Sequence, residues 1–172
     1  MFDLHDKIAL VTGASGGIGA QIARALHGQG ATVVLHGTRV SKLEALRTEL
    51  GGRAATVTAN LENRDDVAGL FDSASKAAGG PVNILVNNAG YNDGKNLETA
   101  PEEFMASVHL NLSHVYTLTH LCGEELIRNQ GAIINVSSKV ATTGQGQTSG
   151  YAAAKGAMNA LTREWAIAFA PH

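Results

Sequence analysis

Three polar residues in the last third of the chain have the types and spacing needed to move a proton. Tyr151 and Lys155 lie four positions apart, so on a helix their side chains share one face. A lysine ammonium in that place stabilises the phenolate, which lets the tyrosine act as a general acid or base near neutral pH. Ser138 could hydrogen-bond the same reacting oxygen and stabilise its developing charge. A bare Tyr-x-x-x-Lys pair is also common on ordinary helix surfaces, so this interpretation needs support from elsewhere in the chain.

A glycine-rich run near the N-terminus predicts a phosphate-binding turn. The run Thr12-Gly13-Ala14-Ser15-Gly16-Gly17-Ile18-Gly19 stands where a short apolar stretch gives way to an amphipathic one. Unpaired N–H groups at a helix N-terminus can hold a pyrophosphate, and glycines permit the tight bend and the close approach. A flexible turn is the alternative, but the position between strand and helix favours a dinucleotide. The residues predicted to bind it here are Gly13, Ser15, Gly16, Gly17, Ile18 and Gly19.

The end of the second apolar stretch bears on which dinucleotide is preferred. It reads Leu35-His36-Gly37-Thr38-Arg39, without the carboxylate that would accept hydrogen bonds from the adenosine ribose of NAD. Arg39 with Thr38 could instead hold the 2′-phosphate of NADP by charge-assisted hydrogen bonds. We therefore predict that Gly37, Thr38 and Arg39 bind the cofactor, with NADP(H) favoured over NAD(H). The other interpretation is that Arg39 is a solvated residue opening the next helix.

Amide side chains end the fourth apolar stretch, Leu85-Val86-Asn87-Asn88-Ala89-Gly90. In open α/β sheets ligands bind at the carboxyl edge of the strands, so Asn87, Ala89 and Gly90 are predicted to line the cofactor crevice. Asparagines at this place can also hydrogen-bond neighbouring strands, and the two roles are compatible.

Short β-rich runs alternate with longer amphipathic stretches along the whole chain, and this alternation predicts the scaffold for these residues. We expect one α/β domain over residues 1–172, a Rossmann-type doubly wound parallel sheet wrapped by helices. The predicted strands are Ile8–Thr12, Thr32–His36, Ala54–Ala59, Asn83–Asn87 and Ala132–Val136. The predicted helices are Ile18–Gln29, Ser41–Leu50, Arg64–Ala78, Pro101–Ile127 and Tyr151–Phe169. Ser41 before Glu44, Thr99 before Pro101, and Gly30 after the first helix support these boundaries.

The composition argues against several kinds of partner. A net charge of −2 with scattered Lys and Arg recommends neither nucleic acid nor an anionic membrane, and no apolar stretch is long enough to span a bilayer. The single cysteine, Cys122, suits a buried thiol in a reducing cytoplasm, and the acidic first residues do not resemble a signal peptide. His109, His114 and His120 lack the four-residue spacing of helical metal sites, so no metal is assigned. A small molecule is the expected partner.

Taken together, these motifs resemble the short-chain dehydrogenase/reductase family from Lys7 to His172. The resemblance rests on Gly13-x-x-x-Gly17-x-Gly19, on Asn87-Asn88-Ala89-Gly90, and on Ser138 with Tyr151 and Lys155. It implies an enzyme that moves hydride between a nicotinamide cofactor and a carbonyl or secondary alcohol, on a sheet of strand order 3-2-1-4-5. It also implies a fourth catalytic residue at Asn111, an adenine contact at Asn60-Leu61, and a contact from Lys155 to the nicotinamide ribose.

Finer resemblances leave the substrate open. The first half of the chain is similar to bacterial reductases of 3-oxoacyl groups on acyl carrier protein. The second half, from Tyr91 to Tyr151, is more similar to sugar dehydrogenases of the same family. Both a divergent member and an engineered hybrid of two parents are open interpretations. A cofactor-binding module without turnover and a scaffold that merely retains the fold are the competing functions.

Family members normally continue with two further strands and a segment that covers the substrate, so the resemblance implies that the C-terminal part is missing. The missing part would be explained by a fragment, by a shortened chain or by an incomplete sequence, and all three explanations are open. The fifth strand would then be an unprotected apolar edge, which favours pairing with a copy of this chain or with a complementary chain. A homo-oligomer is therefore expected.

Overall fold

The apolar runs form a parallel sheet because helices can then bury both faces of each strand. The structure is a computed structural model that describes residues 3–170. The strands are β1 (Ile8–Val11), β2 (Thr32–His36), β3 (Ala54–Val57), β4 (Ile84–Asn87) and β5 (Ala132–Asn135). They are all parallel and lie in the order β3-β2-β1-β4-β5, which confirms the predicted fold class and strand order.

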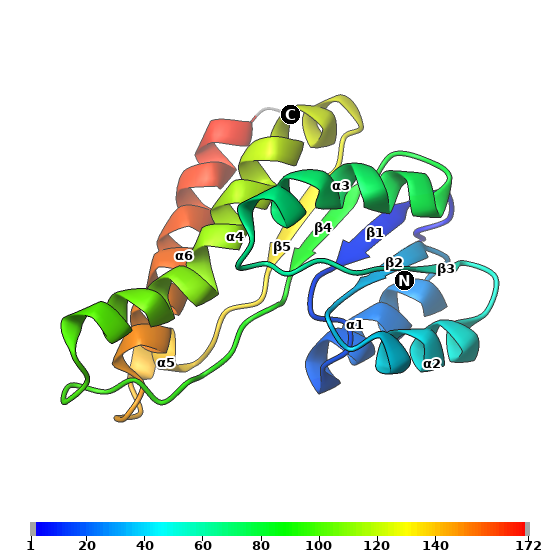
Figure 1. The fold of residues 1–172 in the computed structure, drawn as a ribbon. Coiled ribbons are helices and arrows are strands. Elements are labelled where there is room, and N and C mark those ends of the chain that lie inside the picture. The colour runs from blue at the N-terminus through cyan, green and yellow to red at the C-terminus, as the bar shows by residue number, and fades with distance from the viewer. Residues whose placement is uncertain (1–2, 171–172) are drawn as a thin grey trace.

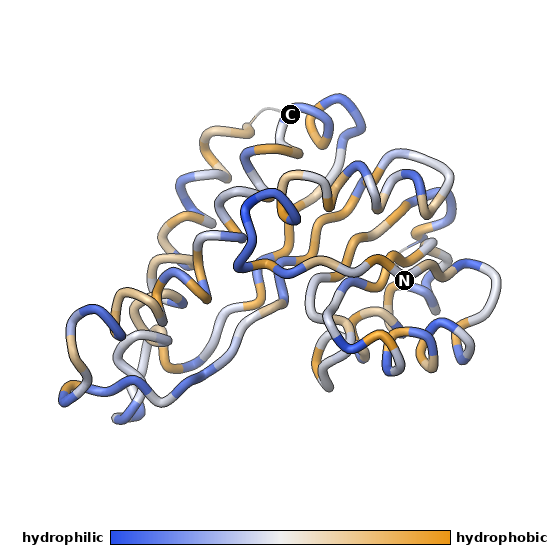
Figure 2. Tube along the Cα trace, viewed as in Figure 1, coloured by the Kyte–Doolittle hydropathy of each residue, from blue (hydrophilic) through white to orange (hydrophobic). Residues whose placement is uncertain are grey.

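Helices cover both faces of this sheet (Figure 1). The helices are α1 (Gly17–Gly28), α2 (Val40–Leu50), α3 (Arg64–Ala78), α4 (Pro101–Arg128), α5 (Val140–Thr143) and α6 (Ser149–Phe169). Alternate residues of β1 point to opposite faces: Val11 packs with the cluster under α1 and α2, whereas Leu10 packs with the cluster under α3 and α4. The strands accordingly form a band of apolar residues through the middle of the molecule (Figure 2).

The strand register brings the predicted motifs to one edge of the sheet. Val11 lies beside Leu35 of β2 and Val86 of β4, so these three strands end at the same level. The glycine turn, the run from His36 to Arg39 and the Asn87–Gly90 run therefore meet at the carboxyl edge, where ligands bind in folds of this type.

Most predicted boundaries agree with the structure to within two residues, and α3 has the predicted bounds. The capping box at Ser41 is wrong, because α2 begins at Val40 and Glu44 instead hydrogen-bonds Arg47 and Thr56. Thr99 is not the cap of α4 either. Its hydroxyl oxygen accepts a hydrogen bond from the Asn96 N–H, and the helix begins at Pro101 after Ala100. Gly30 has the expected positive φ of 102° after α1.

Within the described residues, β5 is an edge strand of the sheet. Its side chains alternate between exposed and half-buried, and Ile134 is 44% exposed. Among residues 3–170, none of the helices has the length and apolar character that crossing a membrane requires.

Candidate active site and cofactor cleft

A cleft of about 560 Å³ opens at the carboxyl edge of the sheet. It runs from the glycine turn and the end of β2, past the end of β4, to the start of α6. It brings together every predicted cofactor residue except Asn87. The lining includes Gly13, Ser15, Gly16, Gly17, Ile18, Gly19, Gly37, Thr38, Arg39, Asn60, Leu61, Ala89, Gly90, Tyr151 and Lys155.

The glycine turn has the shape that a pyrophosphate requires. Gly13 has a φ of 67°, and a Cβ on Gly19 would lie 2.4 Å from the Gly13 carbonyl oxygen, so neither position accepts a side chain easily. A Cβ on Gly17 would meet no atom within 4 Å apart from its chain neighbours and the backbone of its own helix, and Gly17 lines the cleft. Gly17 begins α1 without a side-chain cap, which leaves the first N–H groups of the helix for an anion.

Thr12 and Asn88 fasten the turn to the end of β4. The Asn88 Nδ2 donates to the Thr12 carbonyl at 2.8 Å. The Thr12 hydroxyl donates to the Val86 carbonyl and accepts from the N–H groups of Asn88 and Ala89, each at 3.0 Å. Asn88 lines the cleft and was missed by the sequence prediction, although the alternation of side chains along a strand could have separated it from Asn87.

Asn87 has a structural position below the cleft. It is fully buried, and its Nδ2 donates to Asn135 Oδ1 at 2.9 Å. Asn135 in turn donates to the Thr162 hydroxyl at 2.9 Å. These contacts join β4 to β5 and α6, so the predicted direct contact of Asn87 with a cofactor gains no support from its placement.

The end of β2 combines close packing with a positive charge. A Cβ on Gly37 would lie 2.7 Å from the Ser15 hydroxyl, so an acidic side chain here would crowd the glycine turn. The Arg39 Nη2 donates to the Ser15 carbonyl at 2.7 Å, which holds the exposed guanidinium at the mouth of the cleft. Since a guanidinium has five N–H donors, this contact leaves others for a phosphate.

Lys155 lies at the inner end of the cleft, beside Tyr151. Its side chain is 2% exposed, its Nζ donates to the Val136 carbonyl at 2.9 Å, and the same atom lies 5.7 Å from the centre of the Tyr151 ring. Burial lowers the pKa of Lys155 to about 8, because the charged ammonium loses water contacts. The predicted tyrosine–lysine pair is therefore brought together in a desolvated place.

Asn111 lies behind this pair, on α4. Its side chain holds the backbone of Tyr91 in both directions: Oδ1 accepts from the Tyr91 N–H at 2.7 Å and Nδ2 donates to the Tyr91 carbonyl at 3.0 Å. A Cβ on Gly90 would lie 3.2 Å from Asn111 Oδ1 and 3.3 Å from Lys155 Nζ, so both side chains flank this glycine. Asn111 is fully buried and does not line the cleft.

The two serines after β5 differ in their positions. Ser137 lines the cleft, and its hydroxyl donates to the Lys155 carbonyl at 3.3 Å, which ties the start of α6 to the end of β5. Ser138 opens the segment to α5, and its hydroxyl accepts from the Val140 N–H at 3.4 Å. That contact leaves the proton of the Ser138 hydroxyl available to a substrate oxygen.

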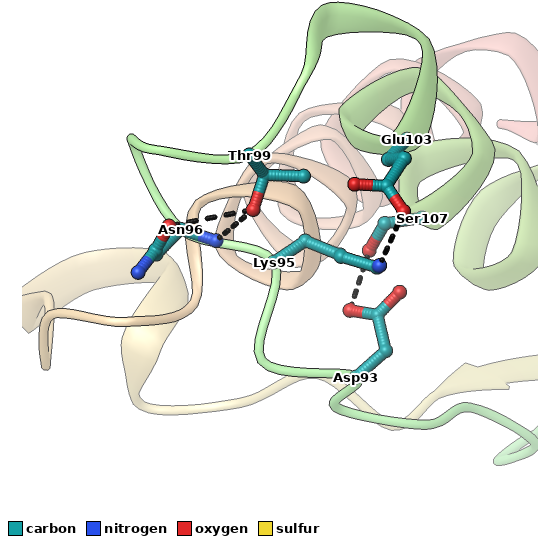
Figure 3. A network of polar contacts seen from close by, with 6 residues as sticks. All are labelled: Asp93, Lys95, Asn96, Thr99, Glu103 and Ser107. Carbon is teal, nitrogen blue, oxygen red and sulfur yellow. Dashed lines mark hydrogen bonds and ion pairs between the residues drawn. The ribbon is translucent and has the colours of Figure 1, made fainter.

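A polar network that the sequence analysis did not assign holds the loop before α4 (Figure 3). Ser107 donates to Asp93 at 2.8 Å, and Lys95 pairs with Glu103 at 3.0 Å. The same loop reaches α6, because the Gly150 N–H donates to the Lys95 carbonyl at 3.2 Å. The network therefore fixes the residue that precedes Tyr151. The pairs Lys95–Glu103 and Asp93–Ser107 are 8 and 14 residues apart, spacings that carry no sequence signal.

Comparisons with known proteins agree with this geometry. The family model "short chain dehydrogenase" matches residues 7–172. Nodulation protein G from Rhizobium sp. (strain N33) is 45% identical over 168 residues, covering 96% of this chain and 68% of that protein. L-fucose dehydrogenase from Bos taurus is 36% identical over 163 residues, covering 94% and 60%.

Among solved structures, 3-ketoacyl-(acyl-carrier-protein) reductase from Brucella melitensis complexed with NADH superposes with a TM-score of 0.90. The two sequences are 32% identical, and the match covers 98% of this chain and 72% of the reductase. The chain thus spans 60–72% of the length of these three proteins. The family model matches residues 7–172, and the glycine turn and the tyrosine–lysine pair line the same cleft. This chain therefore belongs to the short-chain dehydrogenase/reductase family of oxidoreductases.

Proposed function

We propose that this chain binds NADP(H) and catalyses hydride transfer between the nicotinamide and a carbonyl or secondary alcohol. The observation that carries the proposal is the placement of Tyr151 beside the buried amine of Lys155, in the same cleft as the glycine turn. A dinucleotide whose pyrophosphate rests on α1 can extend through this cleft to the pair. The open space at Gly17 is the fit that this binding needs.

In the proposed mechanism, the bound nicotinamide supplies or accepts the hydride at the substrate carbon. Tyr151 donates its phenolic proton to the carbonyl oxygen in reduction and takes the hydroxyl proton in oxidation. The ammonium of Lys155 stabilises the phenolate that reduction leaves behind. Ser138 donates a hydrogen bond to the same substrate oxygen. Asn111 holds the backbone at Tyr91, which forms the wall behind the reacting groups.

The substrate belongs to one of two chemical classes in this proposal, 3-oxoacyl thioesters or sugars. The similarity to a 3-ketoacyl reductase and to an L-fucose dehydrogenase supports both. Steady-state kinetics with NADPH against a panel of 3-oxoacyl thioesters and aldoses, and with NADP⁺ against lactols and sugar alcohols, separates them.

Replacing Tyr151 by Phe tests the proposed proton donor. The variant keeps the ring but lacks the transferable proton, so we expect turnover to fall by about 10²- to 10⁴-fold. Cofactor affinity, measured by calorimetry, should stay close to that of the wild type. Tyr116→Phe is the matched control, because this tyrosine is 55% exposed on α4 and is not part of the cleft lining. Near-normal turnover by Tyr151→Phe would assign the proton transfer to another group.

A second candidate function is a cofactor-binding module without efficient turnover. It is favoured by one observation: the cleft lining holds the predicted cofactor residues other than Asn87, but neither Ser138 nor Asn111 is part of it. Tight cofactor binding with no turnover of any substrate in the panel would support this candidate.

A further inference from the structure

A buried histidine connects the two parts of the cleft that meet a dinucleotide. His36, the last residue of β2, is 2% exposed and lines the cleft. Its Nδ1 lies 3.4 Å from the N–H nitrogen of Gly13 in the glycine turn. Its Nε2 lies 3.1 Å from the carbonyl oxygen of Ala59, next to Asn60 and Leu61 on the adenine side. One imidazole ring therefore spans from the pyrophosphate turn to the predicted adenine pocket.

These two contacts determine the protonation state of the ring. A backbone N–H can only donate, so Nδ1 must accept from Gly13; a carbonyl can only accept, so Nε2 must donate to Ala59. Both conditions hold only for the neutral ring that carries its proton on Nε2. An imidazolium would point a second N–H at the Gly13 N–H, and the contact with the glycine turn would be lost.

The surroundings of the ring also disfavour its charged form. Burial lowers the pKa of His36, while the hydrogen bond to Ala59 opposes this shift. The pKa of His114 on α4, which is itself buried, is lowered in part by the charges of Lys155 on α6 and of His36, so the three groups lie within electrostatic reach. At the mouth of the cleft, Arg39 before α2 and Glu62 after β3 complete the charged groups of the lining. The hydrogen-bond partners of the ring, Gly13 after β1 and Ala59 after β3, are backbone groups.

We propose that His36 is a positioning residue: its neutral imidazole holds the glycine turn and the adenine-side loop at a fixed separation, so that protonating it weakens dinucleotide binding. The inference rests on the proposed cofactor binding, and it adds a residue and a pH dependence to that site. The backbone of His36 serves the same end, because its carbonyl accepts from the Ala14 N–H at 2.8 Å.

The test compares His36→Gln with His36→Leu. A glutamine amide can donate and accept as the neutral ring does but does not titrate, whereas leucine fills the space without hydrogen bonds. The affinity for NAD⁺ is measured by calorimetry from pH 8 down to the lowest pH at which circular dichroism shows a folded chain. NAD⁺ is the probe because it lacks the 2′-phosphate of NADP⁺, a monoester that titrates near pH 6.

We expect the wild-type affinity for NAD⁺ to be constant near neutral pH and to fall in acid. His36→Gln should bind within about threefold of the wild type at pH 7.5 without the acid loss, and His36→Leu should bind about tenfold more weakly at every pH. His114→Gln is the control, since it removes the other buried histidine of the cleft and should keep the acid loss.

The outcomes separate this inference from the function on which it rests. An acid loss that persists in His36→Gln overturns the inference, as does a His36→Leu variant that binds like the wild type. If the wild-type chain binds neither NAD⁺ nor NADP⁺ at neutral pH, the proposed function itself fails.

Discussion

The Ser15 carbonyl holds Arg39 beside the glycine turn, so its guanidinium loses little conformational freedom when it binds a 2′-phosphate. A charge-assisted hydrogen bond of this kind has an effect of about tenfold on affinity. We therefore predict that Arg39→Ala weakens NADP(H) binding about tenfold and leaves NAD(H) binding nearly unchanged.

Calorimetry with both cofactors checks this prediction, with Arg47→Ala as the control. Arg47 is an exposed arginine of α2 that pairs with Glu44 and is not part of the cleft lining. Equal losses for NADP(H) and NAD(H), or a wild-type preference for NAD(H), would contradict the assignment of Arg39 to the phosphate.

His114 has a different effect, on the stability of the fold. It is 3% exposed, and burial lowers its pKa to about 4, with smaller contributions from Lys155 and His36. An unfolded histidine titrates near pH 6.5, so between pH 6.5 and pH 4 the unfolded chain binds more protons than the folded chain. The free energy of unfolding must therefore fall as the pH falls through this window.

We predict that His114→Gln makes the free energy of unfolding less dependent on pH between 6.5 and 4. The contribution removed is at most about 3 kcal/mol over this range, since each pKa unit corresponds to about 1.4 kcal/mol. Urea unfolding at a series of pH values measures it, and His109→Gln, an exposed residue of the same helix, is the control. Equal slopes for His114→Gln and the wild type would mean that folding leaves the pKa of this ring unchanged.

At the scale of elements, two glycines at the junction of β1 with α1 have different roles, one in the stability of the fold and one in cofactor binding. A Cβ on Gly19 would collide with the backbone of Gly13 and with the side chain of Asn88, so Gly19→Ala must move the turn against β4. A Cβ on Gly17, which lines the cleft, meets no atom within 4 Å apart from its chain neighbours and its own helix backbone, and alanine is the better helix former.

We predict that Gly17→Ala keeps or slightly raises the melting temperature while weakening dinucleotide binding at least about tenfold, because the methyl group occupies the place of the phosphates. Gly19→Ala should lower the melting temperature as well as the affinity. Thermal denaturation and calorimetry on the two variants check this difference. Unchanged affinity in Gly17→Ala would place the pyrophosphate elsewhere.

The order of the elements and most of the cleft could be predicted because both follow from local patterns. Buried strands, amphipathic helices and glycines at strand ends leave signals in consecutive residues. The finer contacts depend on which way a side chain turns. Asn87 and Asn88 are identical in sequence terms, yet the pleat of β4 buries the first against Asn135 and turns the second towards the glycine turn.

The predicted caps of α2 and α4 failed because the polar side chains there have other hydrogen-bond partners. Glu44 accepts a hydrogen bond from Thr56 of β3 instead of capping the helix start, and Thr99 closes a turn with Asn96. The loop of Figure 3 gave no signal, since its side chains pair with α4 and its backbone with α6. The partners of such groups exist only in the folded chain.

At the scale of the whole molecule, the outer edge of β5 is the feature most exposed to association. Within residues 3–170, β5 pairs with β4 alone, so N–H and C=O groups on its other side are available to another strand. Ile134 adds an apolar side chain that is 44% exposed at this edge. Such an edge is a ready template for pairing, and charged side chains are the usual protection against it.

We predict that the 172-residue chain self-associates through this edge and that Ile134→Lys shifts it towards the monomer. The lysine places a charge where two copies would meet, and it should leave cofactor binding intact because Ile134 does not line the cleft. Sedimentation velocity over a range of concentrations measures the association.

Ile167→Lys is the control, since Ile167 is 79% exposed on α6 and the change adds the same charge away from the edge. If Ile167→Lys dissociates the oligomer and Ile134→Lys does not, the copies associate through the face of α6 that carries Ile167. A wild-type chain that stays monomeric at all concentrations would show that the β5 edge is protected in solution.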